Sequence, residues 1–152
     1  MMTEVDPATM FKSVAAYLSW DHDRLDALLD TVRSRVYNAE WPAARRDYDE
    51  FARGLKRHIR LEEDILFPIV ERVAPKGHTL AMRDEHTRIR GVLGTLHDAV
   101  RSGNEAAFRS ALAVLLSVLR GHNEKEEDVL YPADQSLPET ERAALLRRLR
   151  SE

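Results

Sequence analysis

Hydrophobic residues recur every three or four positions along four long segments of the chain. This spacing places an apolar stripe along one face of an α-helix, whereas a half-buried strand needs strict alternation, which no segment shows. The four helices are predicted at about residues 7–38, 41–67, 78–101 and 105–131. A shorter amphipathic segment near the end of the chain, RAALLRRLR at 142–150, predicts a fifth helix.

Proline and capping residues mark the ends of the predicted helices. Asp6-Pro7 is typical of a helix start, because aspartate caps the first amides and proline fits the first helical position. Pro68 lies inside the second apolar pattern. Proline lacks an amide donor and clashes with the preceding turn, so we expect this helix to kink or end near Phe67.

Four helices joined by short turns predict an all-α fold, an up-down-up-down antiparallel four-helix bundle with a short C-terminal extra helix. We expect a flexible N-terminus at 1–6, the bundle at 7–133 and the short helix at 134–152. Ser136 and Glu139 are spaced as a capping box for that last helix. The residues of the third helix predicted to face the core are Leu80, Met82, Ile89, Val92, Leu93, Leu96 and Val100.

Composition narrows the classes of function. Hydrophobic residues make up 43% of the chain and charged residues 32%, which is enough apolar matter for a core. The net charge of −3, without a basic block, argues against a nucleic-acid binder. The absence of cysteine excludes disulfides and thiolate metal sites. The longest apolar run, 111–119, is shorter than the roughly 20 residues of a membrane helix, and no export signal is evident, so a cytoplasmic location without membrane contact is expected.

An internal repeat contains the candidate functional residues. Four histidines and two glutamates recur at an offset of 64 positions without a gap. They are His22, His58 and Glu62 in the first half, and His86, His122 and Glu126 in the second. In each half the second histidine follows the first by 36 positions, and the glutamate follows the second histidine by four. The chain is therefore predicted to be two related helix pairs, each with a lone histidine followed by a His-x-x-x-Glu motif.

The spacing of His-x-x-x-Glu places both side chains on one face of a helix, one turn apart. Apolar residues flank the motif on the same face, as Leu55 and Ile65 do in the first half. The polar groups are therefore expected to face the core. Buried imidazoles and carboxylates need partners, and no lysine or arginine lies on these faces to neutralise the glutamates. A cation held by the converging helices is the simplest way to satisfy them.

The donor types restrict which metal this site can hold. Imidazole and carboxylate without thiolate suit iron, zinc, nickel or copper better than calcium or magnesium. Six ligands are too many for one tetrahedral zinc, but they divide into two sets of two histidines and one carboxylate, as in non-heme iron sites. If both glutamates bridge and an oxo or hydroxo group is shared, one position on each metal stays open. The predicted ligands are His22, His58, Glu62, His86, His122 and Glu126.

These motifs resemble those of the bacterial hemerythrin-like proteins, the HHE cation-binding domain family, over about residues 10–133. The resemblance rests on the order of the six residues and on the matching endings EEDILFP and EEDVLYP. It implies a four-helix bundle with a di-iron centre, in which the two glutamates bridge two iron ions that zinc or manganese could replace. The implied ligand is small (O2, nitric oxide or peroxide), and the implied role is oxygen binding or storage, or detoxification of peroxide or nitric oxide.

Two positions depart from the animal oxygen carriers of that family. The carriers have a further histidine four residues after the third-helix ligand, where this chain has Arg90. Their fourth-helix carboxylate is an aspartate one position later than Glu126. The site therefore has one nitrogen ligand fewer than the carriers, which leaves a coordination position open on both metals. Such a site suits activation of peroxide, nitric oxide or oxygen more than simple oxygen carriage. The sequence leaves open whether the protein is an enzyme.

Other functions fit the same pattern. One is a metal- or oxygen-responsive sensing or interaction module, and another is a metal-storage bundle without turnover. A ferritin-type site is disfavoured, because its Glu-x-x-His motif is absent at the equivalent places. His78 and His97 have no mates in the repeat and are predicted not to be ligands. Glu63, Glu127 and the aspartate after each are predicted to be solvated or to orient imidazoles of neighbouring helices.

Overall fold

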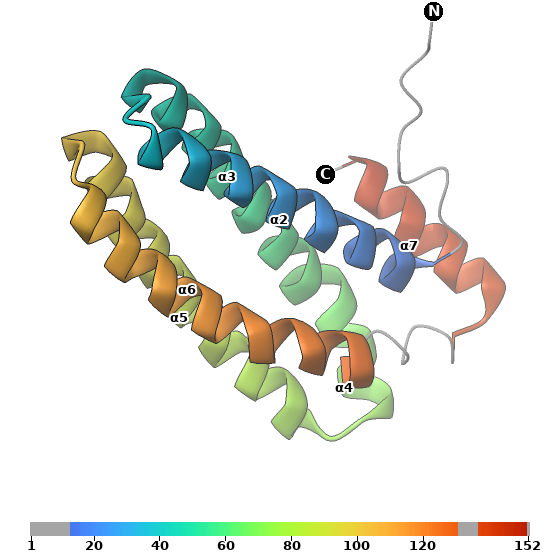
Figure 1. Ribbon diagram of the computed structural model, residues 1–152. Helices are drawn as coiled ribbons and strands as arrows, with labels where there is room; N and C mark the ends of the chain where they lie inside the picture. The colour runs from blue at the N-terminus through green and yellow to red at the C-terminus, as the bar shows by residue number, and fades with distance from the viewer. Residues whose placement is uncertain (1–12, 131–136, 152) are drawn as a thin grey trace, which may run out of the picture.

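The computed structural model describes residues 13–130 and 137–151, which form helices and short connections with no strand among them (Figure 1). The α-helices are α2 (Val14–Tyr37), α3 (Trp41–Leu61), α4 (Phe67–Val73), α5 (Lys76–Ser102), α6 (Glu105–Lys125) and α7 (Glu139–Ser151). Two π-helical turns, η1 (Glu62–Leu66) and η2 (Glu126–Leu130), follow α3 and α6. The all-helical prediction is confirmed over these residues. None of the described helices is long and apolar enough to cross a bilayer.

The four long helices pack as two pairs. α2 packs along α3 and α5 packs along α6, with short connections at residues 38–40 and 103–104. α3 also contacts α5, which joins the two pairs into a helical bundle. In Figure 1, α7 lies beside the first part of α2. Gly103 ends α5 with a φ of 66°, a left-handed conformation that glycine adopts without steric cost.

Two apolar clusters fill the interior and leave a polar level between them. The larger cluster includes Leu25, Leu29, Ile89, Leu93, Leu96, Phe108 and Leu115, and the smaller includes Val14, Leu18, Leu61, Phe67, Met82 and Leu145. Along α2, His22 comes between Leu18 of the smaller cluster and Leu25 of the larger. Along α5, His86 likewise comes between Met82 of the smaller cluster and Ile89 of the larger, so both histidines have apolar side chains on either side of them along the helix.

The first described helix begins later than the sequence pattern predicts. Ser13 has an extended backbone (φ −149°, ψ 155°), and its hydroxyl accepts a hydrogen bond of 3.1 Å from the amide of Ala16. A serine cap satisfies an amide that has no partner inside the helix, so α2 starts at Val14. The prediction of one continuous helix from residue 7 is therefore wrong at this point. Asp6-Pro7, the predicted start, lies outside the described residues.

Pro68 does not end the helix that contains it. The π-helical turn η1 precedes it, and the amide of Phe67 bonds to the carbonyl of Glu62, five residues back. Pro68 then falls in the first turn of α4, where a missing amide donor costs least. The sequence predicts that the helix kinks or ends near Phe67. The helical backbone does not end there but continues as α4 to Val73, and its regular α-helical pattern is interrupted by the π turn just before the proline. The second π turn starts at Glu126, the mate of Glu62 in the repeat.

One residue predicted to face the core is on the surface. Leu80 is 61% exposed, while Thr79 and Met82 are buried. The buried stripe of α5 runs through positions 79, 82, 86, 89, 93, 96 and 100. Leu80 is two residues before Met82, about 200° around the helix, so it points away from this stripe.

The predicted C-terminal helix is present as α7, which starts at Glu139 and runs to Ser151. Leu137 and Leu145 are buried in the smaller apolar cluster. Arg72 at the end of α4 donates a hydrogen bond of 2.6 Å to Glu141. These contacts attach α7 to the bundle at the α2 and α4 end. Ser136, the predicted capping residue, lies outside the described residues.

Candidate metal centre

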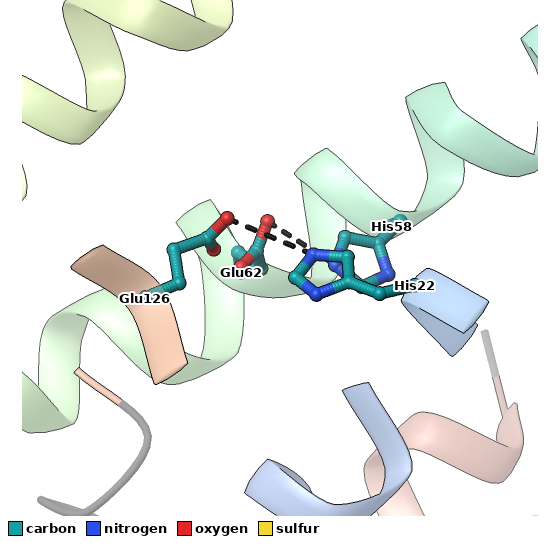
Figure 2. A group of neighbouring side chains, drawn as sticks. All are labelled: His22, His58, Glu62 and Glu126. Carbon is teal, nitrogen blue, oxygen red and sulfur yellow. Dashed lines mark ion pairs between the residues drawn. The ribbon is translucent and has the colours of Figure 1, made fainter. Parts of the chain in front are cut away.

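The six predicted ligands meet at the polar level inside the bundle. His22 comes from α2, His58 from the last turn of α3, His86 from the middle of α5 and His122 from the last turn of α6. The two glutamates are the first residues of η1 and η2. All six residues are buried, with exposures of 6% or less. Figure 2 shows four of them turned toward one another: His22 from α2, His58 and Glu62 from the continuous segment of α3 and η1, and Glu126 from η2.

The six side chains form two groups that share both glutamates. The α2/α3 group is His22, His58, Glu62 and Glu126, and the α5/α6 group is His86, His122, Glu62 and Glu126. Within each group, one ligand atom from every residue lies within 4.8 Å of the others. Either group is therefore compact enough to surround one metal ion.

Each glutamate faces one histidine from each group. Oε1 of Glu62 lies 3.4 Å from Nε2 of His58 and 3.4 Å from Nε2 of His86. Oε1 of Glu126 lies 2.5 Å from Nε2 of His122 and 3.7 Å from Nε2 of His22. A carboxylate placed between two imidazoles in this way is suited to bridging two metal ions.

Several donor atoms at this centre lack the hydrogen bonds that buried polar atoms need. Nε2 of His58 and both carboxylate oxygens of Glu126 are buried without a hydrogen bond in the described part of the chain. Over the same residues, Glu126 pairs with His22 and His122 and with no lysine or arginine. A buried carboxylate without a cation costs several kcal/mol. The residues present therefore fit a cation, and their nitrogen and oxygen atoms suit a transition metal.

The pKa shifts favour the protonation states that bind metal. The pKa of His22 is lowered to about 3, chiefly by burial and next by the nearby His58. Burial also lowers the pKa of His122. For Glu62, burial raises the pKa, but the surrounding histidines outweigh burial and the net shift is downward. Neutral imidazoles and an ionised carboxylate are the forms in which these side chains coordinate metals.

Four carboxylates from neighbouring helices face the outer nitrogens of the four histidines. The Nδ1–carboxylate distances are 2.8 Å for His58 and Asp21, 2.7 Å for His122 and Glu85, 3.3 Å for His86 and Glu63, and 3.7 Å for His22 and Glu127. A carboxylate at Nδ1 selects the tautomer with a free Nε2 and sets the orientation of the ring. The hydrogen bonds to Asp21 and Glu85 thus turn Nε2 of His58 and of His122 toward the centre, and Glu63 and Glu127 lie beside Nδ1 of His86 and of His22 at longer distances.

Two of these carboxylates, Asp21 and Glu85, were not predicted from the sequence. Burial raises the pKa of Asp21, but its hydrogen bond to His58 and the neighbouring Arg24 outweigh burial, and the net shift is downward. The pKa of Glu85 is lowered in the same way by Lys125 and His122, against the effect of burial. A signal for both was available, because each precedes a lone histidine and the two are related by the 64-position offset.

The remaining candidates of the sequence analysis lie elsewhere. His78 and His97 are exposed and belong to neither group. Arg90, where oxygen carriers have a histidine, donates a hydrogen bond of 2.6 Å to Glu63. The aspartates after Glu63 and Glu127 are exposed. Phe67 stacks on the ring of His86, with centroids 5.5 Å apart and planes 8° from parallel, and so packs against a predicted ligand.

Comparison with protein families gives one match. A family model described as the hemerythrin HHE cation binding domain matches residues 14–133. The matched range contains both groups of histidines and glutamates. Neither the curated proteins nor the solved structures gave a match.

Proposed function

The chain belongs to the hemerythrin HHE cation-binding domain family, and we propose that it holds two iron ions and uses them to bind a small ligand. The ligand class is O2, nitric oxide or peroxide. The role that follows is oxygen binding or storage, or removal of peroxide or nitric oxide. The scaffold we propose is the up-down-up-down order of α2, α3, α5 and α6, which the short connections at 38–40 and 103–104 favour.

The observation that carries this proposal is the pair of glutamates shared by two groups of histidines. Each group offers two imidazoles, and both offer the same two carboxylates. We assign one metal position to the α2/α3 group and one to the α5/α6 group, with Glu62 and Glu126 as bridges. Histidine and carboxylate donors without thiolate are typical of non-heme iron. Iron, when bound, supplies a redox-active centre with positions for a small molecule.

The surroundings of the centre favour a small ligand over a large substrate. His58, His86, Glu62 and Glu126 are fully buried, and apolar clusters lie on both sides of them. Such packing keeps bulk water from the donor atoms and excludes a large substrate from them. The outer carboxylates hold the imidazoles in place, so the chain itself orients and shields the site.

Metal analysis with single-residue variants tests the proposed metals. The purified protein, loaded with iron(II) without oxygen, is expected to retain about two irons per chain, one for each group. Glu126→Gln removes a shared donor and is expected to lower the retained iron at both positions. His97→Gln, a histidine outside both groups, is the matched control and is expected to retain the full amount. A protein that accepts stoichiometric zinc but no iron would contradict the proposal.

Exposure of the reduced, iron-loaded protein to small molecules tests the proposed ligand class. O2, nitric oxide and hydrogen peroxide are each added while the absorption spectrum is followed. A spectral change with at least one of the three is expected, and it is expected to be absent in the Glu126→Gln variant. Release under vacuum indicates binding, whereas steady consumption indicates turnover. An iron-loaded protein that responds to none of the three contradicts the proposed ligand class.

A further inference from the structure

The two lone histidines of the repeat have unequal outer carboxylates. Oε1 of Glu63 lies 3.3 Å from Nδ1 of His86, whereas Oε1 of Glu127 lies 3.7 Å from Nδ1 of His22. The side chain of Glu63 is 17% exposed and that of Glu127 is 49% exposed. One carboxylate is therefore held close to its imidazole, and the other lies half in solvent.

Two arginines of α5 hold Glu63 in place. Arg90 donates a hydrogen bond of 2.6 Å to Oε1 of Glu63. Nη1 of Arg83 lies 3.7 Å from Oε2, and Nη2 of Arg83 donates to the backbone carbonyl of Glu63 at 3.4 Å. The 64-position offset maps Arg90 onto Asp26 and Arg83 onto Ser19, so both basic residues are lost in the other half.

Asp26 cannot perform the role of its mate. Burial raises the pKa of Asp26, and the negative charges of Asp23, Asp30 and Glu127 raise it further. Asp26 is thus close enough to Glu127 to repel it, where Arg90 attracts Glu63. Over the described residues, the ion-pair partner of Glu127 is His22, and no lysine or arginine pairs with it.

The difference is confined to this one pair of carboxylates. Asp21 and Glu85 face the other two histidines, and both have a basic partner. Nε of Arg24 lies 2.8 Å from Asp21, and Nζ of Lys125 lies 2.7 Å from Glu85. Among the residues that the structure describes, three of the four outer carboxylates therefore have a cation that holds them, and Glu127 has none.

We propose that Arg90 is a positioning residue that acts through Glu63, and that the α5/α6 group consequently binds a divalent metal before the α2/α3 group does. This inference rests on the proposed function. An outer partner of a ligating histidine typically changes metal affinity by about 10- to 100-fold. The positive charges of Arg83 and Arg90 oppose cation binding, but their side chains are 35% and 41% exposed, so solvent and salt screen that repulsion.

Zinc titration of the metal-free protein tests the order of binding. Zn²⁺ is the probe, and the imidazole ¹H–¹⁵N resonances of the four histidines report which group binds first. The resonances of His86 and His122 are expected to shift below one equivalent, and those of His22 and His58 only afterwards. Arg90→Gln is expected to weaken the first step by about 10- to 100-fold. Arg109→Gln is the control, because Arg109 pairs with Glu105 at the far end of α6 and the charge change is the same.

The direction in which Asp26→Arg changes the affinity of the second zinc-binding step distinguishes two explanations. If contact with the outer carboxylate decides affinity, a guanidinium at position 26 captures Glu127 and strengthens the second step. If long-range charge decides affinity, the same substitution weakens that step and overturns the inference. Simultaneous shifts of all four histidines, or prior binding at the α2/α3 group, also overturn it while leaving the proposed function standing. A wild-type protein that binds neither zinc nor iron overturns both.

Discussion

Oδ2 of Asp21 lies 2.8 Å from Nδ1 of His58, so a carboxylate of α2 holds an imidazole of α3. Asp21 is 1% exposed, and the next residue in the chain is His22. One turn of α2 therefore supplies both a donor to the centre and an anchor for a donor on the neighbouring helix. Glu85 of α5 makes the matching contact with His122 of α6 at 2.7 Å.

Removing the charge of Asp21 is expected to weaken metal binding at the α2/α3 group. Asp21→Asn keeps the shape of the side chain but loses the ionised partner of His58, so the dissociation constant is expected to rise by about 10- to 100-fold. Competition against a chelator measures it. Asp23→Asn makes the same charge change at an exposed residue two positions away and is expected to have a much smaller effect. Equal effects of the two variants would show that charge, rather than contact, is responsible.

Metal removal is expected to destabilise the fold. A ligand that binds only the folded state adds about 2.7 kcal/mol at a free concentration 100 times its dissociation constant. Chelation is therefore expected to lower the free energy of unfolding, measured in urea, by at least this amount. Glu126→Gln is expected to abolish most of the difference between metal-free and metal-loaded protein, whereas His78→Gln at an exposed site keeps it. Identical unfolding curves with and without metal would contradict this prediction.

The metal-free protein is expected to lose stability in mild acid. The folded pKa of His22, about 3, lies below its ordinary value of 6.5, so the unfolded chain binds a proton in this range and the folded chain does not. The contribution of His22 to the free energy of unfolding is fully present above about pH 6.5. It is lost as the pH falls toward 3, at up to about 1.4 kcal/mol per pH unit.

Urea unfolding at several pH values, in the presence of a chelator, measures this slope. His22→Gln removes the titrating group and is expected to reduce the slope. His78→Gln, which changes an exposed histidine, is expected to leave it unchanged. A slope that is the same in wild type and His22→Gln would refute the assignment to His22.

Shortening a leucine side chain is expected to lower the free energy of unfolding more at a buried position of the larger apolar cluster than at an exposed position. Leu115 is fully buried, so Leu115→Ala is expected to lower the free energy of unfolding by about 2–5 kcal/mol. Leu80→Ala is the matched control, because Leu80 is on the surface, and a change within about 0.5 kcal/mol is expected. Denaturant titration of both variants measures the difference. A comparable loss in Leu80→Ala would place that side chain in an interface.

The sequence anticipated much of the fold because helical periodicity is local. Apolar spacing placed the starts of α3, α5 and α6 within two residues of those observed. It placed the start of the first described helix wrongly, because Ser13 caps α2 through a backbone conformation that the apolar pattern does not report. It predicted an irregularity of the helix near Pro68, but not that this irregularity is a π turn after which the helix continues.

The sequence by itself determined which six side chains point inward and that they recur in two halves, because residues four apart on a helix share a face whatever surrounds it. Only the tertiary structure decided that Glu62 lies between His58 and His86, since this depends on how α3 and α5 pack. The partners of the outer carboxylates also became known only from the tertiary structure, because the contact between Arg90 and Glu63 joins residues on different helices. Periodicity along one helix cannot specify the rotation of its neighbour, and that rotation sets every distance across the centre.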